Sequence, residues 1–406
     1  MTTEHGTTAS PRGATSGLGS GGAISPGAAS PARRGRRAVP QPLRVIVLTP
    51  GVGGMGGISR LMDFVAEDLA EEPRPALAVT FVSTRRDVFK ALRPLVFAFA
   101  LLRVAYACAS GRCALLHINL ASYGSTYRKL SFAAIARATG TPYVVHLHGG
   151  MYKEFWDTRS PRMKQRIDAL FRQAEHVLVL GAVWRDLVAA NLPDVAGRIT
   201  VLPNATREPA TIRLRSHSEP FTILFIGRLN EAKGVTHLVE ALASLRHVGG
   251  WRAILAGDGE VSRTRAAVQN AGLEDRVEVP GWLEAGEVAA LWRKGDAFVL
   301  PSFVENLPLS IIEAFAYGVP VICTPVGSIP ELVEDGRTGL IVPAGDSAAL
   351  ARALDRLMAS QLLCRALAEN GRREFLERFE LRGYVDRLAA LWKNASDPAL
   401  ERVQVR

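Results

Sequence analysis

The chain has 406 residues, of which 48% are hydrophobic and 22% charged, and its formal net charge is +10. That length accommodates two domains with substantial cores, and the composition is that of a globular protein. The four cysteines lack C-x-x-C spacing, which excludes a disulfide framework and favours reduced, buried thiols in a cytosolic protein. The longest apolar run, 95–108, is too short to span a bilayer and contains Arg103, so a core helix is favoured there over an interfacial one.

The charge is distributed unevenly between the two halves. Residues 1–210 carry 26 Lys and Arg against 14 Asp and Glu, which is +12, and residues 211–406 carry 23 against 25, which is −2. A basic first half suits work at an anionic membrane surface, or it reflects an arginine-rich composition without a partner. No nucleic-acid-binding motif accompanies the charge, so nucleic acid is not expected as a partner.

The first 42 residues differ from the rest. Ala, Gly, Ser, Thr and Pro dominate them without apolar periodicity, and they include the basic cluster 33–37. They lack the apolar core of a secretory signal, so we expect a disordered basic tail over 1–42. A start codon further along the chain is the alternative for part of it.

From residue 43 onward, apolar strands alternate with helical patterns. We expect strands at 43–49, 76–82, 114–119, 143–147 and 177–180, and helices at 59–71, 88–109, 127–138 and within 161–174. The polar segment 204–220 predicts a linker, and the alternation resumes at 221 and continues to about 358. This pattern predicts an α/β chain with two parallel sheets, each covered on both faces, in domains 43–203 and 221–380. A last helix near 384–393 lies in the C-terminal segment 381–406.

Two glutamates, Glu305 and Glu313, flank the start of a helix expected after a strand end. Pro308 suits the first helical turn and Gly318 the position just past the helix end, which places Glu313 about two turns along. The free amides of the first turn, on Asn306, Leu307, Leu309 and Ser310, attract anions. The two carboxylates can accept hydrogen bonds from hydroxyl groups, and the amides between them can hold a phosphate. This arrangement matches a nucleotide-sugar. The plainer alternative is that Glu305 caps the helix and Glu313 lies on its solvated face.

Basic residues also follow an earlier strand, 221–226. Arg228 and Lys233 lie in the loop before an amphipathic helix, at the carboxyl end of that strand, where open parallel sheets bind ligands. Arginine can fork onto two phosphate oxygens and lysine supplies a compact charge. Taken alone, they are equally well explained as ordinary residues of a surface turn.

Several motifs occur together in a fixed order. They are G-R-L-x-x-x-K-G (227–234), A-G-D-G-E (256–260), V-P-G-W-L (279–283), the E-x7-E pair followed by E-A-F-A-Y-G-V-P-V-I, and V-E-D-G-R-T-G-L-I-V (333–342). In this the chain resembles the retaining nucleotide-sugar glycosyltransferases of family four, including those that make bacterial exopolysaccharides. The resemblance covers roughly residues 43–395 and is strongest in the second half. It implies the GT-B fold, with a first domain for the acceptor, a second for the donor, and a C-terminal helix that crosses back to the first.

The resemblance also implies roles for individual residues. The catalytic residues expected from it are His148, Arg228, Lys233 and Glu305. The residues expected to bind the donor are Gly56, Gly57, Asn306, Leu307, Leu309, Ser310 and Glu313. Glu305 would hold hydroxyls of the donor sugar and Glu313 those of the ribose.

Two histidines close the fourth strand of the first half. His148 matches the family's acceptor-side histidine, and we prefer it to His146 because strand alternation is expected to direct His146 to the other side. A structural histidine satisfied by the backbone is the alternative for either one. The loop 117–129 resembles the acceptor loops of exopolysaccharide enzymes, with a basic solvated loop as its alternative.

A glycine-rich loop offers a rival function. Gly51, Gly53 and Gly56 form a literal G-x-G-x-x-G between a strand and a helix, and Arg85 and Arg86 follow the second strand. This is the pattern of an NADP-dependent reductase, which leaves the motifs of the second half unexplained. In the family, Gly56 and Gly57 instead face the donor diphosphate, and glycine lets the backbone approach closely.

The remaining expectations concern partners. No D-x-D motif or His/Cys cluster is present, so no metal is expected, and Arg228, Lys233 and the helix amides supply the positive charge. We expect a hexosyltransferase with a nucleotide-diphospho-sugar donor and a saccharide or polyprenyl-diphosphate-linked saccharide acceptor, peripheral on the inner face of the plasma membrane. A catalytically inactive nucleotide-sugar-binding protein is the alternative from the binding class. GDP-mannose and UDP-hexoses are both candidate donors.

Overall fold

The computed structural model describes residues 41–51, 56–85, 92–212 and 220–396. The predicted tail 1–42 lies outside this range except for its last two residues. So do the middle of the glycine-rich loop, Arg86 and part of the predicted linker.

The first half contains a six-stranded parallel sheet in the order β2-β1-β3-β4-β5-β6. Its strands are β1 (Leu43–Thr49), β2 (Leu77–Ser83), β3 (Leu115–Leu120), β4 (Tyr143–Leu147), β5 (His176–Val179) and β6 (Ile199–Val201). The strands β3, β4 and β5 are buried along their whole length, which is why their sequences are nearly continuous apolar runs rather than alternating ones.

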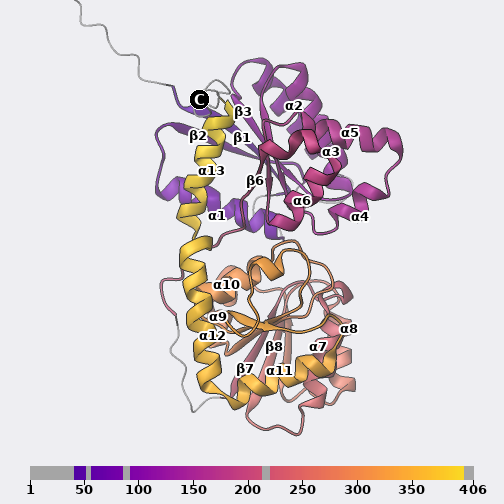
Figure 1. Cartoon of the computed structure of the whole chain (residues 1–406), viewed down its shortest axis with the longest axis vertical. Helices are drawn as coiled ribbons and strands as arrows, with labels where there is room; N and C mark the ends of the chain where they lie inside the picture. Colours follow the sequence, from indigo (N-terminus) through magenta and orange to yellow (C-terminus); the bar gives the residue numbers. More distant parts are fainter. Residues whose placement is uncertain (1–40, 52–55, 86–91, 213–219, 397–406) are drawn as a thin grey trace, which may run out of the picture. The chain divides into compact units, whose positions relative to one another are not determined.

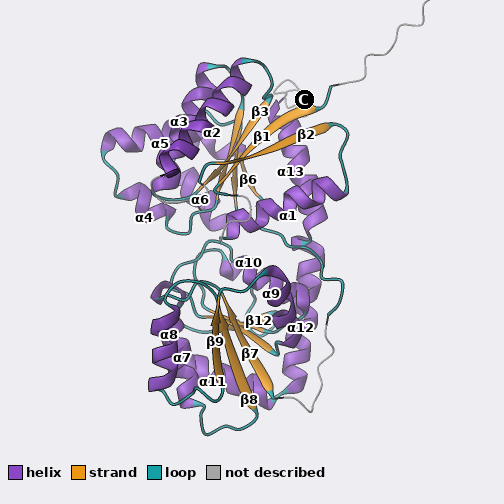
Figure 2. Ribbon diagram, turned by 180° about the vertical axis from the view of Figure 1, so that it is seen from behind, coloured by secondary structure: helices purple, strands orange, loops and turns teal. Residues whose placement is uncertain are grey.

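Helices cover both faces of this sheet (Figures 1 and 2). They are α1 (Gly57–Glu71), α2 (Arg93–Ala109), α3 (Gly124–Ala138), α4 (Tyr152–Asp157), α5 (Pro161–Arg172) and α6 (Ala182–Asn191). Successive residues of β1 point to opposite faces. Val45 and Val47 pack with α1 and the C-terminal helix, whereas Ile46 and Leu48 pack with α2 and α3. Of these elements, the sequence patterns did not indicate α4, α6 or β6.

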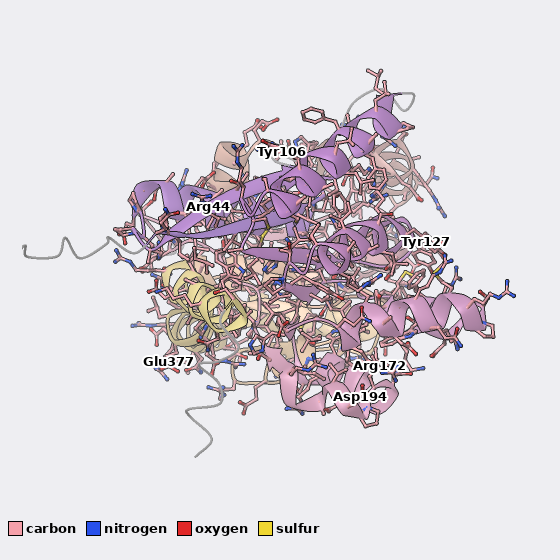
Figure 3. The ribbon with its side chains drawn as sticks, turned by 90° about the horizontal axis from the view of Figure 1, so that it is seen from above. Arg44, Tyr106, Tyr127, Arg172, Asp194 and Glu377 are labelled. Carbon is pink, nitrogen blue, oxygen red and sulfur yellow. The ribbon has the colours of Figure 1, made fainter. Side chains whose placement is uncertain are left out.

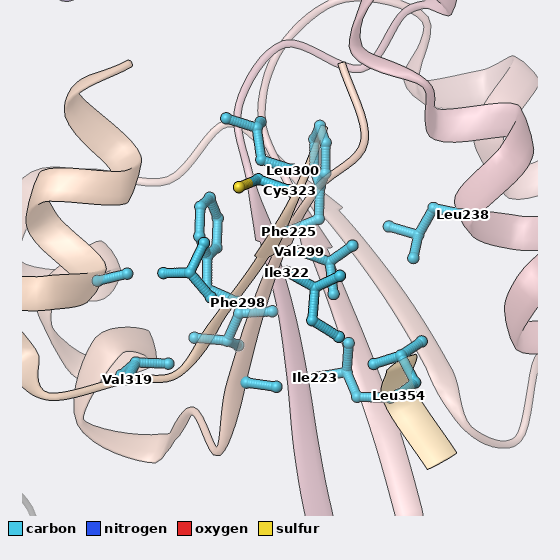
Figure 4. Close-up of a cluster of buried hydrophobic side chains, with 14 of the residues drawn as sticks. Ile223, Phe225, Leu238, Phe298, Val299, Leu300, Val319, Ile322, Cys323 and Leu354 are labelled. Atoms are coloured by element: carbon cyan, nitrogen blue, oxygen red, sulfur yellow. The ribbon is translucent and has the colours of Figure 1, made fainter. Parts of the chain in front are cut away.

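The second half contains another six-stranded parallel sheet, in the order β12-β11-β10-β7-β8-β9. Its strands are β7 (Phe221–Ile226), β8 (Trp251–Ala256), β9 (Val277–Gly281), β10 (Ala297–Leu300), β11 (Val321–Cys323) and β12 (Gly339–Ile341). Figure 4 shows the core around its central strands, where Phe225 and Ile322 lie on one face of the sheet and Phe298 on the other, all without exposure to solvent.

The helices of the second half are α7 (Val235–Ser244), α8 (Val261–Asn270), α9 (Ala285–Lys294), α10 (Leu309–Tyr317), α11 (Ser347–Ala359) and α12 (Gln361–Glu374). Helices α7, α8 and α11 lie together on one face, and α9, α10 and α12 on the other (Figure 2). Both sheets are therefore sandwiched between helical layers, as the alternation predicted.

The last helix, α13 (Leu381–Ser396), returns to the first sheet (Figure 1). Its Trp392 is fully buried and donates a hydrogen bond from Nε1 to His117 Nδ1 at 2.9 Å. Its Asp386 pairs with Arg74 at 2.9 Å. These contacts confirm the predicted crossover helix, and the two sheets confirm the predicted fold class.

Helix α10 departs from expectation in detail. It begins at Leu309, so Pro308 occupies the cap position with ψ of 125° rather than the first turn, and Glu313 lies about one turn along instead of two. Gly318 follows the helix end as predicted, with φ of 67°, the left-handed conformation that favours glycine there.

Helix α2 differs from the expected core helix. Ala100, Val104 and Cys108 are buried, but Leu95, Phe99, Leu102 and Tyr106 are 61–70% exposed. Figure 3 labels Tyr106 on this helix. The helix therefore has a second apolar face directed to solvent. Within the described ranges, no helix combines the length and the hydropathy needed to cross a membrane.

Candidate active site

The site lies where the strand order of the second sheet reverses. Strands β7 and β10 are neighbours there, although their connections run to opposite sides of the sheet. Such a switch point leaves a crevice beyond the carboxyl ends of the two strands, which is where α/β sheets bind ligands. Arg228 follows β7, and the segment that carries Glu305 follows β10.

A cavity of about 700 Å³ opens at this point. Its lining includes residues from both halves of the chain. All eleven residues that the sequence singled out are among them: Gly56, Gly57, His148, Arg228, Lys233, Glu305, Asn306, Leu307, Leu309, Ser310 and Glu313. The fold thus brings together groups up to 257 positions apart in the sequence, the separation of residues 56 and 313.

Lys233 and Glu305 form one unit. Lys233 Nζ lies 2.5 Å from Glu305 Oε1, which also accepts a hydrogen bond from Ser302 Oγ at 2.8 Å. The Glu305 side chain is only 7% exposed, so its charge needs a partner. Gly234 adopts φ of +69° behind Lys233, and a Cβ there would lie 2.0 Å from the Pro301 carbonyl oxygen. Sequence patterns indicated each residue but not their pairing.

Glu313 is buried and paired with a residue that the sequence analysis missed. Arg60, in the first turn of α1, donates from Nε to Glu313 Oε1 at 2.8 Å. Burial raises the pKa of the Glu313 carboxyl, and Arg60 opposes that shift. Glu313 is therefore not the solvated face residue of the plainer alternative. Arg60 carries no motif that would have distinguished it from other arginines.

The start of α10 presents groups suited to an anion. The first amides of an α-helix have no partner within the helix, and here they belong to residues from Leu309 onward. Just before them, Asn204 Nδ2 donates to the Leu307 carbonyl at 2.6 Å. The Asn306 side chain is 7% exposed, and its amide nitrogen and oxygen have no hydrogen-bond partner among the described residues. A buried amide of this kind is costly unless a ligand satisfies it.

His148 is held by a chain of hydrogen bonds that begins in α13. Trp392 donates to His117 Nδ1, so His117 carries its proton on Nε2 and donates to Asn119 Oδ1 at 3.3 Å. Asn119 Nδ2 donates to the Leu48 carbonyl at 3.1 Å, which fixes the orientation of the amide.

Asn119 Oδ1 therefore also accepts from His148 Nε2, at 2.9 Å. Burial, with a contribution from His117, lowers the pKa of His148 to about 3, so the ring is neutral and its Nδ1 is a hydrogen-bond acceptor. Such a ring suits a hydroxyl group of a substrate. The sequence placed Asn119 in the acceptor loop without this role.

The expected orientation of His146 was wrong. Residues two apart on a strand share a face, and the rings of His146 and His148 lie 4.0 Å apart. His148 nevertheless remains the better site residue, because it lines the cavity whereas His146 is fully buried behind it.

Contacts with other protein groups do not explain why glycine occurs at positions 56 and 57. A Cβ on Gly56 would meet no protein atom within 4 Å, and one on Gly57 would lie 3.8 Å from Leu309. Neither glycine is required by packing within the described residues. By contrast, a Cβ on Gly150 would lie 2.7 Å from the Glu305 carbonyl carbon, so the close approach occurs there.

Two further side chains face the cavity in exposed positions. The Arg228 side chain is 64% exposed, and its Nε lies 3.9 Å from Asp258 Oδ2. Trp282, from the V-P-G-W-L motif, lines the cavity and is 50% exposed, whereas Trp251 and Trp292 in the same half are buried. Across the described ranges, no group of three His, Cys, Asp or Glu side chains is arranged to hold a metal ion.

Comparison with known proteins identifies the family. Residues 42–205 match the family described as glycosyl transferase 4-like domain, and residues 207–374 match glycosyl transferases group 1. The chain belongs to the group 1 glycosyltransferases. The two matches divide the chain between residues 205 and 207, at the start of the predicted linker.

Two curated relatives illustrate the range of similarity. The chain is 35% identical over 197 residues to the exopolysaccharide phosphotransferase SCO2592 of Streptomyces coelicolor. The matched region covers 48% of this chain but only 20% of SCO2592. It is 29% identical over 286 residues to the putative colanic acid biosynthesis glycosyltransferase WcaL of Escherichia coli, covering 58% of this chain and 67% of WcaL.

Solved structures support the same fold. The Anabaena protein HepE in complex with UDP-glucose superposes with a TM-score of 0.69 at 20% identity, covering 86% of this chain and 99% of that one. At this identity the likeness establishes the GT-B architecture and nothing finer.

Proposed function

We propose that the protein is a retaining glycosyltransferase that moves a hexose from a nucleotide-diphospho-sugar to a hydroxyl of a saccharide. The observation that carries this proposal is the single cavity at the switch point of the second sheet, lined by all eleven expected residues. It offers amides and cations for a diphosphate, with a carboxylate on either side of them for hydroxyls.

The departing diphosphate would lie against Arg228, Lys233 and the first amides of α10. Groups of this kind stabilise the negative charge that develops on the leaving group, which is usually the largest contribution to catalysis. Because these cations are supplied by the chain, the proposal includes no metal.

The two carboxylates would bind the neutral parts of the donor. Glu305, oriented by Lys233 and Ser302, would accept from hydroxyls of the transferred sugar. Glu313, oriented by Arg60, would accept from the ribose hydroxyls. An oriented, desolvated carboxylate accepts a hydrogen bond from a hydroxyl without first being stripped of water.

The anomeric configuration of the sugar would be retained because the acceptor hydroxyl attacks the anomeric carbon from the face that the diphosphate leaves. The bond from the anomeric carbon to the phosphate oxygen breaks, the bond to the acceptor oxygen forms on the same face, and the acceptor proton passes to the departing phosphate. His148 Nδ1 would accept from a sugar hydroxyl and so orient the ring. No carboxylate nucleophile is needed for this route.

The acceptor we propose is a polyprenyl-diphosphate-linked saccharide of a cell-surface polysaccharide, used at the inner face of the plasma membrane. The excess of +12 in residues 1–210 supports a cytoplasmic, peripheral enzyme at an anionic surface. The names of SCO2592 and WcaL, which refer to exopolysaccharide and colanic acid, support the pathway.

The deciding experiment incubates the protein with UDP-hexoses and GDP-mannose, with and without lipid-linked acceptors, and detects released nucleoside diphosphate. We expect release that depends on the acceptor and persists in EDTA, and NMR of the product should show the anomeric configuration of the donor. An inverted linkage refutes the mechanism. Donor binding without release supports the inactive binding protein, and oxidation of NADPH in the same preparation supports the reductase.

A further inference from the structure

The first half contains a long stretch without acidic residues. Between Asp87 and Glu154 the chain has eight Lys and Arg and not one Asp or Glu. This stretch includes α2, β3, α3 and β4. The cations in the middle of the stretch therefore have no carboxylate nearby in the sequence, and any neutralising partner has to come from elsewhere.

Two of these basic residues lie with Arg85, which precedes the stretch, at the carboxyl edge of the first sheet. Lys129, on α3, is 1% exposed, and its Nζ donates to Thr84 Oγ1 at 2.9 Å. Arg85 adjoins Thr84 and is exposed, and Arg128 adjoins Lys129 and is half-buried. This hydrogen bond joins residues 84–85 to residues 128–129 and so brings the three basic side chains together. We call Arg85, Arg128 and Lys129 the cation cluster.

Within the described residues, the cation cluster has no acidic partner. Arg128 Nε is buried and makes no hydrogen bond there. Burial, followed by the Arg128 charge, lowers the pKa of Lys129 well below its ordinary value, and burial, followed by Arg85, lowers that of Arg128. An unpaired buried amine destabilises a fold, so its presence requires a compensating role.

An apolar groove leads to the cation cluster. It has a volume of about 380 Å³ and lies between β2 and α2, lined by residues that include Phe81, Val82 and Leu95. Its polar lining residues are Arg103 and Ser83, and Ser83 directly precedes Thr84. At the cluster itself, Lys129 Nζ lies 5.7 Å from the Phe132 ring, which in turn packs edge-on against Phe97 of α2.

The groove continues onto the exposed face of α2. Leu92, Leu95, Phe99, Leu102 and Tyr106 recur every three or four residues and are 45–70% exposed, so they form one stripe along the helix. Arg93 and Arg103 lie on the same helix, which has no acid. These surfaces fit a ligand whose hydrocarbon chain lies along the stripe and whose anionic group lies at the cation cluster.

We propose that the cation cluster binds the phosphate groups of an amphiphile whose hydrocarbon chain lies in the groove between β2 and α2, and that this amphiphile is the lipid-diphosphate part of the acceptor. The inference rests on the proposed function and names the acceptor subsite of that reaction. Thr84 joins the two sites, because both its N–H and its Oγ1 donate to the Thr49 carbonyl at the end of β1. The preceding carbonyl, of Leu48, orients Asn119 and through it His148.

Farnesyl diphosphate is the probe, titrated into the full-length protein by calorimetry. We expect binding that requires both parts of the probe, so that pyrophosphate and farnesol each bind at least tenfold more weakly. Lys129→Met should weaken farnesyl diphosphate binding about tenfold. The same variant should keep or raise the melting temperature, because it replaces an unpaired buried amine with an apolar side chain of similar length.

Arg228→Ala is the matched control, because a diphosphate held in the donor cavity would be lost in that variant instead. If Arg228→Ala abolishes binding and Lys129→Met leaves it unchanged, the probe occupies the donor site and the proposal is refuted. Vesicles of anionic phospholipid provide another arm. If they compete fully with farnesyl diphosphate, the cluster recognises bilayer headgroups rather than the acceptor.

Proton uptake distinguishes a ligand-binding lysine from a structural one. The charged or titratable groups near Lys129 are Arg128 on its own helix and His117 on β3. Arg85, which follows β2, acts on Arg128 and so influences Lys129 indirectly. A phosphate on the cluster should raise the lowered pKa of the Lys129 amine, so calorimetry in buffers of different ionisation enthalpy, carried out over a range of pH, should show proton uptake that Lys129→Met abolishes. Uptake that is equal in both proteins overturns the proposal. Nucleoside diphosphate binding is expected to be unchanged in Lys129→Met, and its absence in every protein would count against the proposed function instead.

Discussion

Two lysines, one in each half of the chain, show how differently the two sides of the protein treat charge. Lys233 in the second half lies 2.5 Å from the carboxylate of Glu305 and is 26% exposed. Lys129 in the first half is almost fully buried, and its one hydrogen bond to a described residue is to the Thr84 hydroxyl. The Lys233 charge is neutralised within the protein, whereas Lys129 has no carboxylate partner among the described residues.

The same contrast extends to the surrounding groups. In the second half, Glu313 pairs with Arg60 and Arg228 lies 3.9 Å from Asp258, so these two groups of the cavity, like Lys233, each have an opposite charge nearby. In the described part of the first half, Arg85 and Arg128 have no acidic partner. Preorganised pairs suit a site that binds one donor, whereas unpaired cations suit a site that receives an anion from outside.

The largest expected effect is loss of the paired lysine. Lys233→Ala leaves the buried Glu305 carboxylate unpaired and removes a cation from the leaving group, so kcat should fall about 100- to 1,000-fold. Lys233→Arg should recover part of the loss. Arg365→Ala, which breaks an exposed ion pair with Glu369, is the control and should leave kcat within about twofold. A wild-type rate for Lys233→Ala would contradict its role.

The next effect separates the two glutamates. Glu313→Ala should weaken nucleoside diphosphate binding about 10- to 100-fold, because the ribose contact is lost and Arg60 is left without its partner. Glu305→Ala should change that affinity by less than about twofold while lowering turnover. Calorimetry measures both, and the half-exposed Trp282 gives an independent fluorescence signal. Equal losses in affinity would disprove the division of roles.

The contrast between the lysines can itself be removed. Thr84→Asp gives Lys129 a carboxylate partner in place of the hydroxyl, which makes it resemble Lys233. Farnesyl diphosphate affinity should then fall about tenfold, and Thr84→Ser should be neutral. In a double-mutant cycle with Lys129→Met the two losses should not add, because both remove the same charge. Additive losses would show that the two residues act separately.

Lowering the pH should destabilise the fold of the first half before that of the second half. Burial lowers the pKa of His117 to about 4 and that of His148 to about 3, and it lowers the pKa of His146 as well. Below about pH 6.5 the unfolded chain binds protons that the folded protein does not, so stability is complete above that pH and is lost as the pH falls.

Each of these histidines should contribute about 1.4 kcal/mol per pH unit to the decline in the free energy of unfolding below pH 6.5. His146→Leu should make the decline shallower by about one proton, as measured by urea unfolding between pH 7.5 and 5. Hydrogen exchange should show the first sheet losing protection before the second half, where the two described histidines, His237 and His247, are not buried. Simultaneous loss in both sheets would contradict the assignment.

The smallest effect concerns a contact between the two halves. Glu331 accepts from the backbone N–H groups of Ala182 and Val183 at 2.7 and 3.1 Å, so it caps α6 from the other half of the chain. Glu331→Ala should lower the free energy of unfolding by about 1 kcal/mol, because the cap is exposed to solvent. Thermal unfolding measures the change. A loss as large as that for a buried ion pair would mean that the cap couples the halves strongly.

Local patterns predicted most of the elements and the site residues, but not how those residues are used. Strands β1, β4 and β7 were predicted at their observed bounds, because their apolar runs are bounded by polar or turn residues. Short elements such as α4 and β6 escaped notice, since six and three residues are too few for a periodic pattern. The exposed face of α2 was missed because that helix is apolar all around.

The amino-acid sequence by itself determined the family, the two parallel sheets and the residues that line the donor cavity. These depend on periodicity and on motifs, which are local in the chain. Only the tertiary structure decided which groups neutralise one another. It joins Arg60 to Glu313 across 253 positions and Trp392 to His117 across 275, and it places no described carboxylate against Lys129. Charge pairing acts over a few ångströms in space, and neither the spacing nor the composition of a chain records which distant residues the fold will bring within that range.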